Sequence, residues 1–206
     1  YSNKRIRKVD ASGLIYTYAG NGSASMSGDG GPATAAGITN SGLSVHADGV
    51  GNVYLSQPGA IRKIDPSGTI SRIAGTGVIG YSSDGSSALS VPIGAINSIA
   101  IDSVGDVYFS EYSLFRVRKI SGGILTTVVG NGSSGNTGDG GPATAANIRP
   151  RGLCFDRSGN LYIGILETGP SGYSYIRKVN TAGIISTIAG NGVAGYTGDG
   201  GPATAA

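Results

Sequence analysis

The sequence contains no Trp, one Cys and one His among its 206 residues, and only 13% of its residues are charged. A lone Cys154 excludes an intrachain disulfide framework, and a lone His46 excludes a multi-histidine metal site within this chain. No apolar run approaches the roughly 20 residues that a membrane-spanning helix needs. We therefore expect no bound metal, no cofactor and no membrane span in this segment.

Glycine, in contrast, is abundant. It accounts for 38 of the 206 residues, whereas in proteins on average about 7% of residues are glycine. It follows no strict third-residue period, which argues against collagen, and the low charge argues against a disordered tail. Ser, Thr, Val, Ile and Tyr fill the windows between the glycines, so long helices are disfavoured. These features predict an all-β protein rich in turns. A net charge of +3 is too small to indicate a nucleic-acid partner, and none is expected.

Internal repeats determine the fold prediction. A motif of the type IRKV recurs at 6–9, 61–64, 117–120 and 176–179. GDGGPATAA appears unchanged at 28–36, 138–146 and 198–206, with a degenerate copy, SSDGSSALS, at 82–90. Asp48, Asp102 and Asp156 form a third marker in the same phase. Three markers in one phase establish a repeat of about 55 residues.

Each unit reads as four short strands separated by glycine-containing turns. In one unit, for example, an alternating segment at 98–102 precedes a turn with Gly105, and a second strand follows at 106–109. The IRKV motif forms the third strand, and a β-branched run before Ala-Gly or Val-Gly forms the fourth. Four strands per unit are typical of a β-propeller blade.

These motifs resemble the NHL-repeat β-propeller family over essentially the whole chain, most clearly at 152–206. The resemblance implies a strand order a–b–c–d from the axis outward, with the IRKV motif as strand c. It also implies that the b–c loops and the d–a loops lie on one face. The family includes peptide-amidating lyases, which use metal and histidine ligands in the channel, and an RNA-binding branch.

We predict that residues 1–206 form a single propeller segment. The phase of the repeat places a half blade at its start. We predict a half blade at 1–20, blades at 42–75, 96–130 and 150–190, and inter-blade loops at 21–41, 76–95, 131–149 and 191–206. These contain three complete blades plus two strands, so we expect part of a larger ring of about six blades, completed by further residues or by another chain. At both ends of the segment, apolar residues then lack a neighbouring blade to cover them, which favours association. These residues are Ile6, Val9, Ile176, Val179 and Ile188.

Two sets of aspartates recur with the repeat. The d–a loops contain Asp29, Asp84, Asp139 and Asp199, and strand a ends in Asp48, Asp102 and Asp156. The loop aspartates suggest either a calcium-binding ring of carboxylates or turns that fix each blade against its neighbour. The structural interpretation is favoured, because calcium needs about 6–8 oxygen ligands and no D-x-D spacing is present. We expect one member of each Arg-Lys pair to lie between blades and meet a strand-a aspartate, and the other to extend along a blade face.

Catalytic residues are not evident. His46 lies in a predicted strand a, where it either faces the channel or has a structural role, and Cys154 is expected to be a small buried residue. One histidine cannot reproduce the lyase site within this segment.

The variable b–c loops supply the binding candidates, since variable loops on a fixed scaffold often carry function. These candidates are Gln57, Glu111, Tyr112, Phe115, Glu167, Tyr173 and Tyr175. For the aromatic members, packing of the loop on the blade is an equal alternative. Glu111 matches an acidic position of the family after strand b, whereas Gln57 departs from it.

Asn21 and Asn131 stand in acceptor patterns for N-glycosylation, whereas the equivalent Asn191 does not. Three functions remain open. The first is a non-enzymatic extracellular or cell-surface propeller that binds protein or glycan, or assembles with copies of itself. The second is a lyase or hydrolase whose active site lies mainly outside this segment. The third is an intracellular RNA- or protein-binding propeller.

Overall fold

The computed structural model describes residues 3–39, 44–166, 174–193, 195 and 197–206. The described residues form antiparallel sheets: one of two strands and three of four strands. The first sheet contains β1 (Ile6–Val9) and β2 (Ile15–Ala19). The second contains β3 (Val45–Ala47), β4 (Val53–Gln57), β5 (Ala60–Ile64) and β6 (Ile70–Ala74). The third contains β7 (Ile96–Ile101), β8 (Val107–Glu111), β9 (Arg116–Ser121) and β10 (Ile124–Val129). The fourth contains β11 (Pro150–Phe155), β12 (Leu161–Leu166), β13 (Ser174–Val179) and β14 (Ile185–Ala189).

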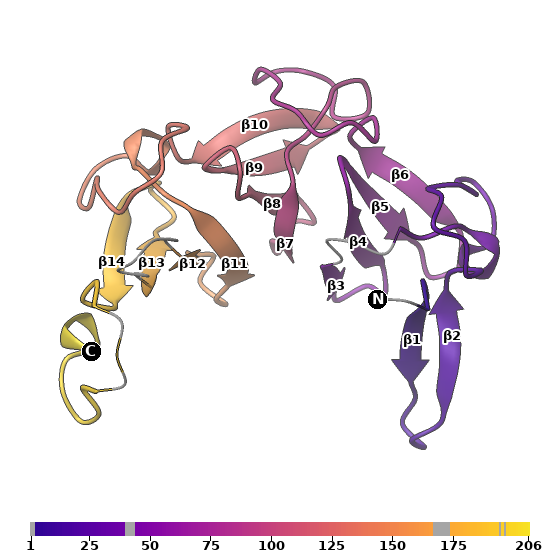
Figure 1. Cartoon of the computed structure of the whole chain (residues 1–206), viewed down its shortest axis with the longest axis horizontal. Helices are drawn as coiled ribbons and strands as arrows, with labels where there is room; N and C mark the ends of the chain where they lie inside the picture. The colour runs from indigo at the N-terminus through magenta and orange to yellow at the C-terminus, as the bar shows by residue number, and fades with distance from the viewer. Residues whose placement is uncertain (1–2, 40–43, 167–173, 194, 196) are drawn as a thin grey trace.

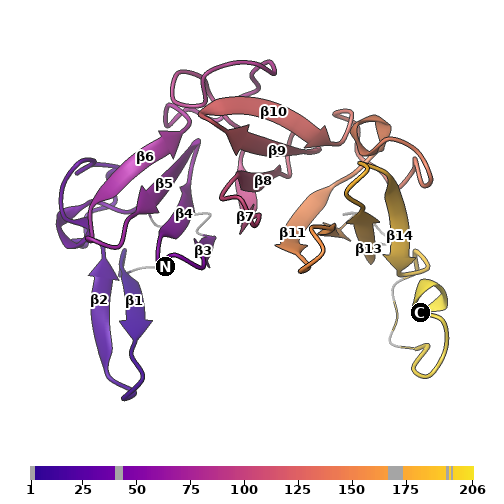
Figure 2. The ribbon, with the colours of Figure 1, turned by 180° about the vertical axis from the view of Figure 1, so that it is seen from behind.

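The four sheets stand side by side along an open arc, as Figure 1 and the reverse view in Figure 2 show. Strands β3, β7 and β11 line the inside of the arc, and β6, β10 and β14 lie on its outside. Within each four-stranded sheet the strands follow chain order and are joined in antiparallel register. This is the a–b–c–d blade predicted from the repeat, so the all-β propeller prediction is confirmed. The number of blades in a complete ring stays a prediction.

The apolar core lies between neighbouring sheets rather than inside any one of them. One cluster joins Tyr54 and Ile61 of the second sheet to Ile99 and Phe109 of the third. A second cluster joins the third and fourth sheets, and there the rings of Tyr108 and Phe155 meet edge to face with centroids 4.8 Å apart. Because side chains alternate along a strand, each blade has two faces, and the second and third sheets pack an apolar face on each of their two neighbours.

Each d–a loop covers the outer edge of the blade that follows it. The loop at 28–36 contains a 3₁₀ helix, η1 (Ala33–Ala35), which Pro32 precedes as the N-cap residue. Gly30 N–H donates to Ile70 O at 2.8 Å, and Ile70 N–H donates to Gly31 O at 3.0 Å. The loop therefore satisfies backbone groups of β6 that an open sheet edge would leave unpaired. The equivalent helices are η2 (Ala143–Ala145) and η3 (Ala203–Ala205).

The glycine after strand d is required by a close backbone contact. Gly130 has φ +93°, and a Cβ atom there would lie 2.3 Å from Phe115 O. Phe115 itself has φ 55°, and the equivalent Gly59 in the preceding blade has φ 63°. The positive φ of Phe115 therefore belongs to the blade geometry and is not evidence of strain at a binding site.

Two expectations about burial are wrong. Cys154 is exposed, because it lies on the face of the fourth sheet against which no other described strand packs. Val179 is only 8% exposed, because its side chain faces the third sheet. Val9 and Ile176 are indeed exposed, at 60% and 41%.

Candidate functional site

Three buried arginines connect consecutive blades. Arg62, Arg118 and Arg177 have no exposed surface, and each forms an ion pair with an aspartate of the preceding d–a loop. Arg62 Nε lies 2.8 Å from Asp29 Oδ1, and its other nitrogens donate to backbone carbonyls of the same loop. Arg118 lies 2.9 Å from Asp84, and Arg177 contacts Asp139. These contacts support the structural interpretation of the loop aspartates.

The expectation that the arginines meet the strand-a aspartates is therefore wrong. Asp48 instead caps the a–b turn of its own blade, accepting hydrogen bonds from the backbone of Asn52 at 2.8 Å and from its side chain at 2.7 Å. Burial raises the pKa of Asp48, but these hydrogen bonds outweigh it and hold the pKa below the ordinary value of 3.8. Burial and the neighbouring Asp48 charge raise the pKa of Tyr54 to about 12.

The lysine of each Arg-Lys pair lies on the opposite sheet face, over a tyrosine ring. Lys119 Nζ is 5.3 Å from the centroid of Tyr108 and 2.6 Å from Asp106 Oδ2. Lys63 lies over Tyr54, and Lys178 over Tyr162, in the same way. Arginine and lysine therefore alternate between the two faces, as expected for adjacent strand residues.

Gln57 and Glu111 are buried beneath the b–c loops rather than exposed on them. Gln57 is 1% exposed and Glu111 has no exposed surface, because strands β4 and β8 extend to these residues. Glu111 accepts a hydrogen bond from Gly94 N–H at 2.6 Å and lies 3.5 Å from Arg118. Burial raises the pKa of Glu111, and the Gly94 N–H and the Arg118 charge only partly oppose this.

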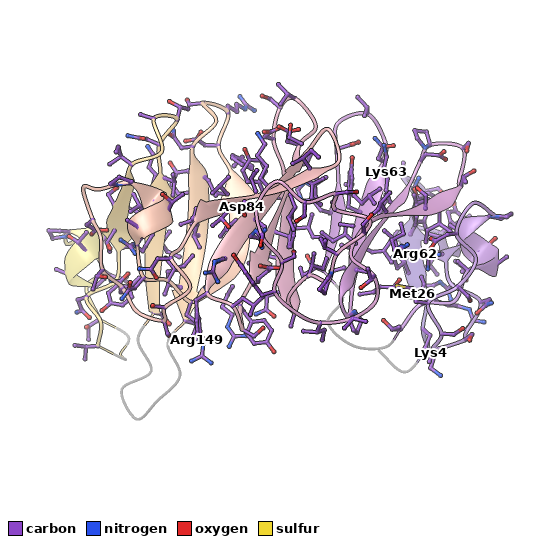
Figure 3. The ribbon with its side chains drawn as sticks, turned by 90° about the horizontal axis from the view of Figure 1, so that it is seen from above. Lys4, Met26, Arg62, Lys63, Asp84 and Arg149 are labelled. Carbon is purple, nitrogen blue, oxygen red and sulfur yellow. The ribbon has the colours of Figure 1, made fainter. Side chains whose placement is uncertain are left out.

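The loop face contains a groove between the second and third sheets. Its volume is about 240 Å³, and it is lined by Gln57, Pro58, Ile79, Ala95, Ile96, Asn97 and Tyr112. Figure 3 shows Lys4 and Arg149 along the same edge of the molecule. Of the predicted binding residues, the structure thus brings Gln57 and Tyr112 together.

A basic residue that sequence reasoning missed contacts Tyr112 without lining this groove: Arg151 lines a separate cavity on the fourth sheet. The Arg151 guanidinium carbon lies 4.8 Å from the Tyr112 ring centroid, and its buried Nε has no hydrogen-bond partner. The pair Arg149 and Arg151 around Pro150 was the available sequence signal. The guanidinium therefore holds the Tyr112 ring from the side of the fourth sheet.

The remaining candidates lie elsewhere. Phe115 is partly buried at the end of its b–c loop, and Tyr175 lines a separate cavity of about 360 Å³ on the fourth sheet. Glu167 and Tyr173 fall outside the described residues. Tyr81, which was not predicted, is 54% exposed and lies beneath the Arg116 guanidinium at 4.9 Å.

The asparagines of the glycosylation patterns hold the d–a loops in place. Asn131 Nδ2, the atom that would carry a glycan, donates to Ala145 O at 3.1 Å, and Asn21 Nδ2 donates to Ala35 O at 2.9 Å. Asn191 makes the same contact with Ala205 O at 3.0 Å. This structural role explains why asparagine recurs at all three positions, whether or not an acceptor pattern follows.

Within the described part of the chain, no group of three His, Cys, Asp or Glu side chains is arranged to hold a metal ion. His46 lies on the inner strand β3 opposite Tyr54 and is partly exposed. Across the same described residues, no helix has the length and apolarity to span a bilayer.

Known structures share this arrangement, although no family model and no curated protein matches the chain. A structural-genomics protein of unknown function from Bacteroides thetaiotaomicron is 22% identical, with a TM-score of 0.60 over 79% of this chain and 40% of its own. An auxiliary nutrient binding protein from the same organism is 14% identical, with a TM-score of 0.55 and the same coverage. Virginiamycin B lyase from Staphylococcus aureus is 14% identical, with a TM-score of 0.50 over 90% of this chain and 48% of its own.

This chain spans less than half the length of each of these three proteins. At such identities the similarity establishes the fold alone. The sheet order and these similarities together define a β-propeller.

Proposed function

We propose that this chain is part of an NHL-type propeller of the cell surface or extracellular space that acts as a non-enzymatic binding scaffold. The IRKV and GDGGPATAA repeats support the NHL assignment. The fold does not select a function, because its structural neighbours include a binding protein and a lyase. The groove on the loop face is the observation that carries the binding proposal.

The chemistry of the groove favours a glycan over a flat protein surface. A volume of about 240 Å³ is below the range of about 300–1,000 Å³ that is usual for drug-sized ligands, and it suits a single sugar ring. The Asn97 amide offers both a donor and an acceptor for sugar hydroxyls, while Ile79 and Tyr112 offer apolar surface.

Calorimetric titration with a panel of neutral and acidic monosaccharides tests this proposal. We expect a neutral monosaccharide to bind, and we expect Asn97→Ala and Tyr112→Ala each to weaken its binding by about tenfold or more. Tyr81→Ala is the matched control, because Tyr81 is also partly exposed beside an arginine but does not line the groove. Equal losses from Tyr81→Ala and Tyr112→Ala, or no sugar binding at all, would contradict the proposal.

A further inference from the structure

One side of the groove on the loop face is formed by Ala95, Ile96 and Asn97, here termed the groove wall. The wall follows directly on the d–a loop, whose buried Ile93 belongs to the core between the second and third sheets. Two residues separate Ile93 from Ile96, where strand β7 begins. The length of this short connection distinguishes the third sheet from the fourth.

The fourth sheet reaches its inner strand with one residue fewer. There, Arg149 alone separates the equivalent buried Ile148 from Pro150, where strand β11 begins. The connection in the third sheet thus contains one additional residue, next to Gly94. An additional residue brings an additional backbone N–H group, which needs a hydrogen-bond partner when it is buried.

The side chain of Glu111 supplies that partner. Gly94 N–H donates to Glu111 Oε1 at 2.6 Å, and a Cβ atom on Gly94 would lie only 3.0 Å from Glu111 Cβ. Glu111 pairs with Ile96 at the start of β7. At the start of β11, Pro150 pairs with Ile165, whose side chain has no acceptor. The carboxylate and the additional residue therefore occur together in the third sheet, and the equivalent described strands of the fourth sheet contain neither.

The position of Asn97 depends on how the wall begins. Tyr112 N–H donates to Ala95 O at 3.3 Å, which ties the wall to the b–c loop. The pairing register of β7 and β8 then shifts between Ile96 and Ile99, so Asn97 lies within an irregular part of the strand. The hydrogen bond at Gly94 fixes the segment that enters this irregularity. It thereby acts on the amide that lines the groove.

The same carboxylate connects the groove wall to the arginine between the blades. Arg118 lies 3.5 Å from Glu111 Oε2 and 2.9 Å from Asp84 Oδ1, and neither Arg118 nor Glu111 has exposed side-chain surface. If Glu111 is replaced, Arg118 keeps its ion pair with Asp84. The junction between the blades is therefore retained in a variant that loses the contact with Gly94.

We propose that Glu111 is a positioning residue of the groove, whose carboxylate holds the groove wall through Gly94 N–H and so places Asn97 for the sugar. This role rests on the proposed sugar-binding function and adds to it a residue that does not line the groove. Groups that contact a ligand keep a productive geometry only when a supporting shell holds them, and here one buried hydrogen bond is that support.

The chain itself supplies a matched pair of substitutions. Glu111→Ile introduces the residue of the fourth sheet, Ile165, and removes the acceptor. Glu111→Gln introduces the residue of the second sheet, Gln57, and keeps an acceptor oxygen. Both side chains are buried at the end of strand b in their own sheets, so both variants are expected to fold.

Hydrogen exchange of the Gly94 amide, followed by NMR on the 206-residue chain and both variants, tests the contact without any sugar. We expect Glu111→Ile to accelerate exchange at Gly94 by at least about tenfold and Glu111→Gln to retain the protection. The Gly85 amide, which donates to Leu125 O at 2.9 Å in the same d–a loop, is the internal control and should not change. Unchanged exchange at Gly94 in Glu111→Ile overturns the proposal.

Calorimetric titration with the tightest-binding neutral monosaccharide tests the effect on the groove. Glu111→Ile should weaken binding by about tenfold or more, and Glu111→Gln should bind within about twofold of the unmodified chain. Val107→Ala is the control, because Val107 is buried in the same core at the other end of β8, and it should lower stability without changing affinity.

Unchanged affinity in Glu111→Ile overturns the proposal, as does an equal loss in Val107→Ala, which would attribute the effect to general stability. If the unmodified chain binds no sugar, the proposed function fails. The exchange rate at Gly94 then decides by itself whether Glu111 holds the groove wall.

Discussion

Arg62 Nε lies 2.8 Å from Asp29 Oδ1, although the two residues are 33 positions apart and belong to successive repeats. The guanidinium is fully buried, whereas 40% of the aspartate side chain is exposed. The ion pair is therefore anchored on the arginine side and open to water on the aspartate side. The buried arginine also donates to Gly37 O and Ser27 O, so one side chain fixes the whole d–a loop on the next blade.

Glu111→Gln should preserve or increase stability at neutral pH. The equivalent residue in the preceding blade is Gln57, whose Oε1 accepts from Arg62 at 3.4 Å in the same way. Burial raises the pKa of Glu111, so the folded state binds a proton more tightly than the unfolded state. Its contribution to stability is therefore greatest below the ordinary pKa of 4.5 and declines as pH rises through the folded-state value.

Denaturant titrations of both proteins across this pH range check the prediction. The glutamine variant should lack this decline while keeping the rest of the pH profile. A marked loss of stability at neutral pH in the variant would show that the Glu111 charge is needed for Arg118.

Gly130→Ala should destabilise the protein more than Gly140→Ala. Both glycines have positive φ, which costs an L-residue about 1–2 kcal/mol. A Cβ at Gly130 would also lie 2.3 Å from Phe115 O, whereas one at Gly140 would meet nothing within 4 Å. We expect losses of about 3 kcal/mol or more and about 1 kcal/mol, respectively, from the free energy of unfolding. Equal losses would mean that the backbone contact relaxes without cost.

Acid should unfold the protein through the turn-capping aspartates Asp48 and Asp156 and through Asp139, which pairs with Arg177 between blades. The side chain and backbone of Asn160 donate to Asp156 and lower its pKa. At Asp48 and Asp139, burial raises the pKa but hydrogen bonds outweigh it. Because the folded pKa values lie below 3.8, their stabilisation is present above that pH and is lost as pH falls through the folded values.

Asp156→Asn should reduce the fall of the melting temperature at acid pH. Asp199→Asn serves as the control, because it removes an exposed charge that has no ion pair among the described residues. An acid limb unchanged by Asp156→Asn would assign the transition to other groups.

The repeat made the four-stranded unit and its turn positions predictable, because three markers recur in one phase, and the resemblance to the NHL-repeat family implied the strand order. The partners of the arginines were not predictable in the same way. Both aspartate sets recur with the blade period, and the sequence alone does not show which set the arginine face meets. In the structure, the pairing register of β5 and β6 shifts between Ile61 and Arg62, and a shift lies at the same place in the first and fourth sheets. This shift accompanies the orientation of the arginine side chain toward the preceding loop.

The candidate site was only partly predictable. Tyr112 was identified from a variable loop, but Asn97 comes from the start of an inner strand and reaches the groove only through the packing of neighbouring blades. Gln57 was expected in a loop, yet β4 extends to include it and turns its side chain inward. Because Gln57 continues the alternation of β4, its side chain lies on a sheet face instead of projecting from a loop.

The central claim, that a loop aspartate and a buried arginine hold successive blades together, is tested most directly by a double-mutant cycle on Asp139 and Arg177. The free energy of unfolding is measured for Asp139→Ala, Arg177→Met, the double variant and the unmodified chain. We expect a coupling energy of about 1–3 kcal/mol, because the two residues are in contact and the arginine is fully buried. Additivity within about 0.5 kcal/mol would contradict the account.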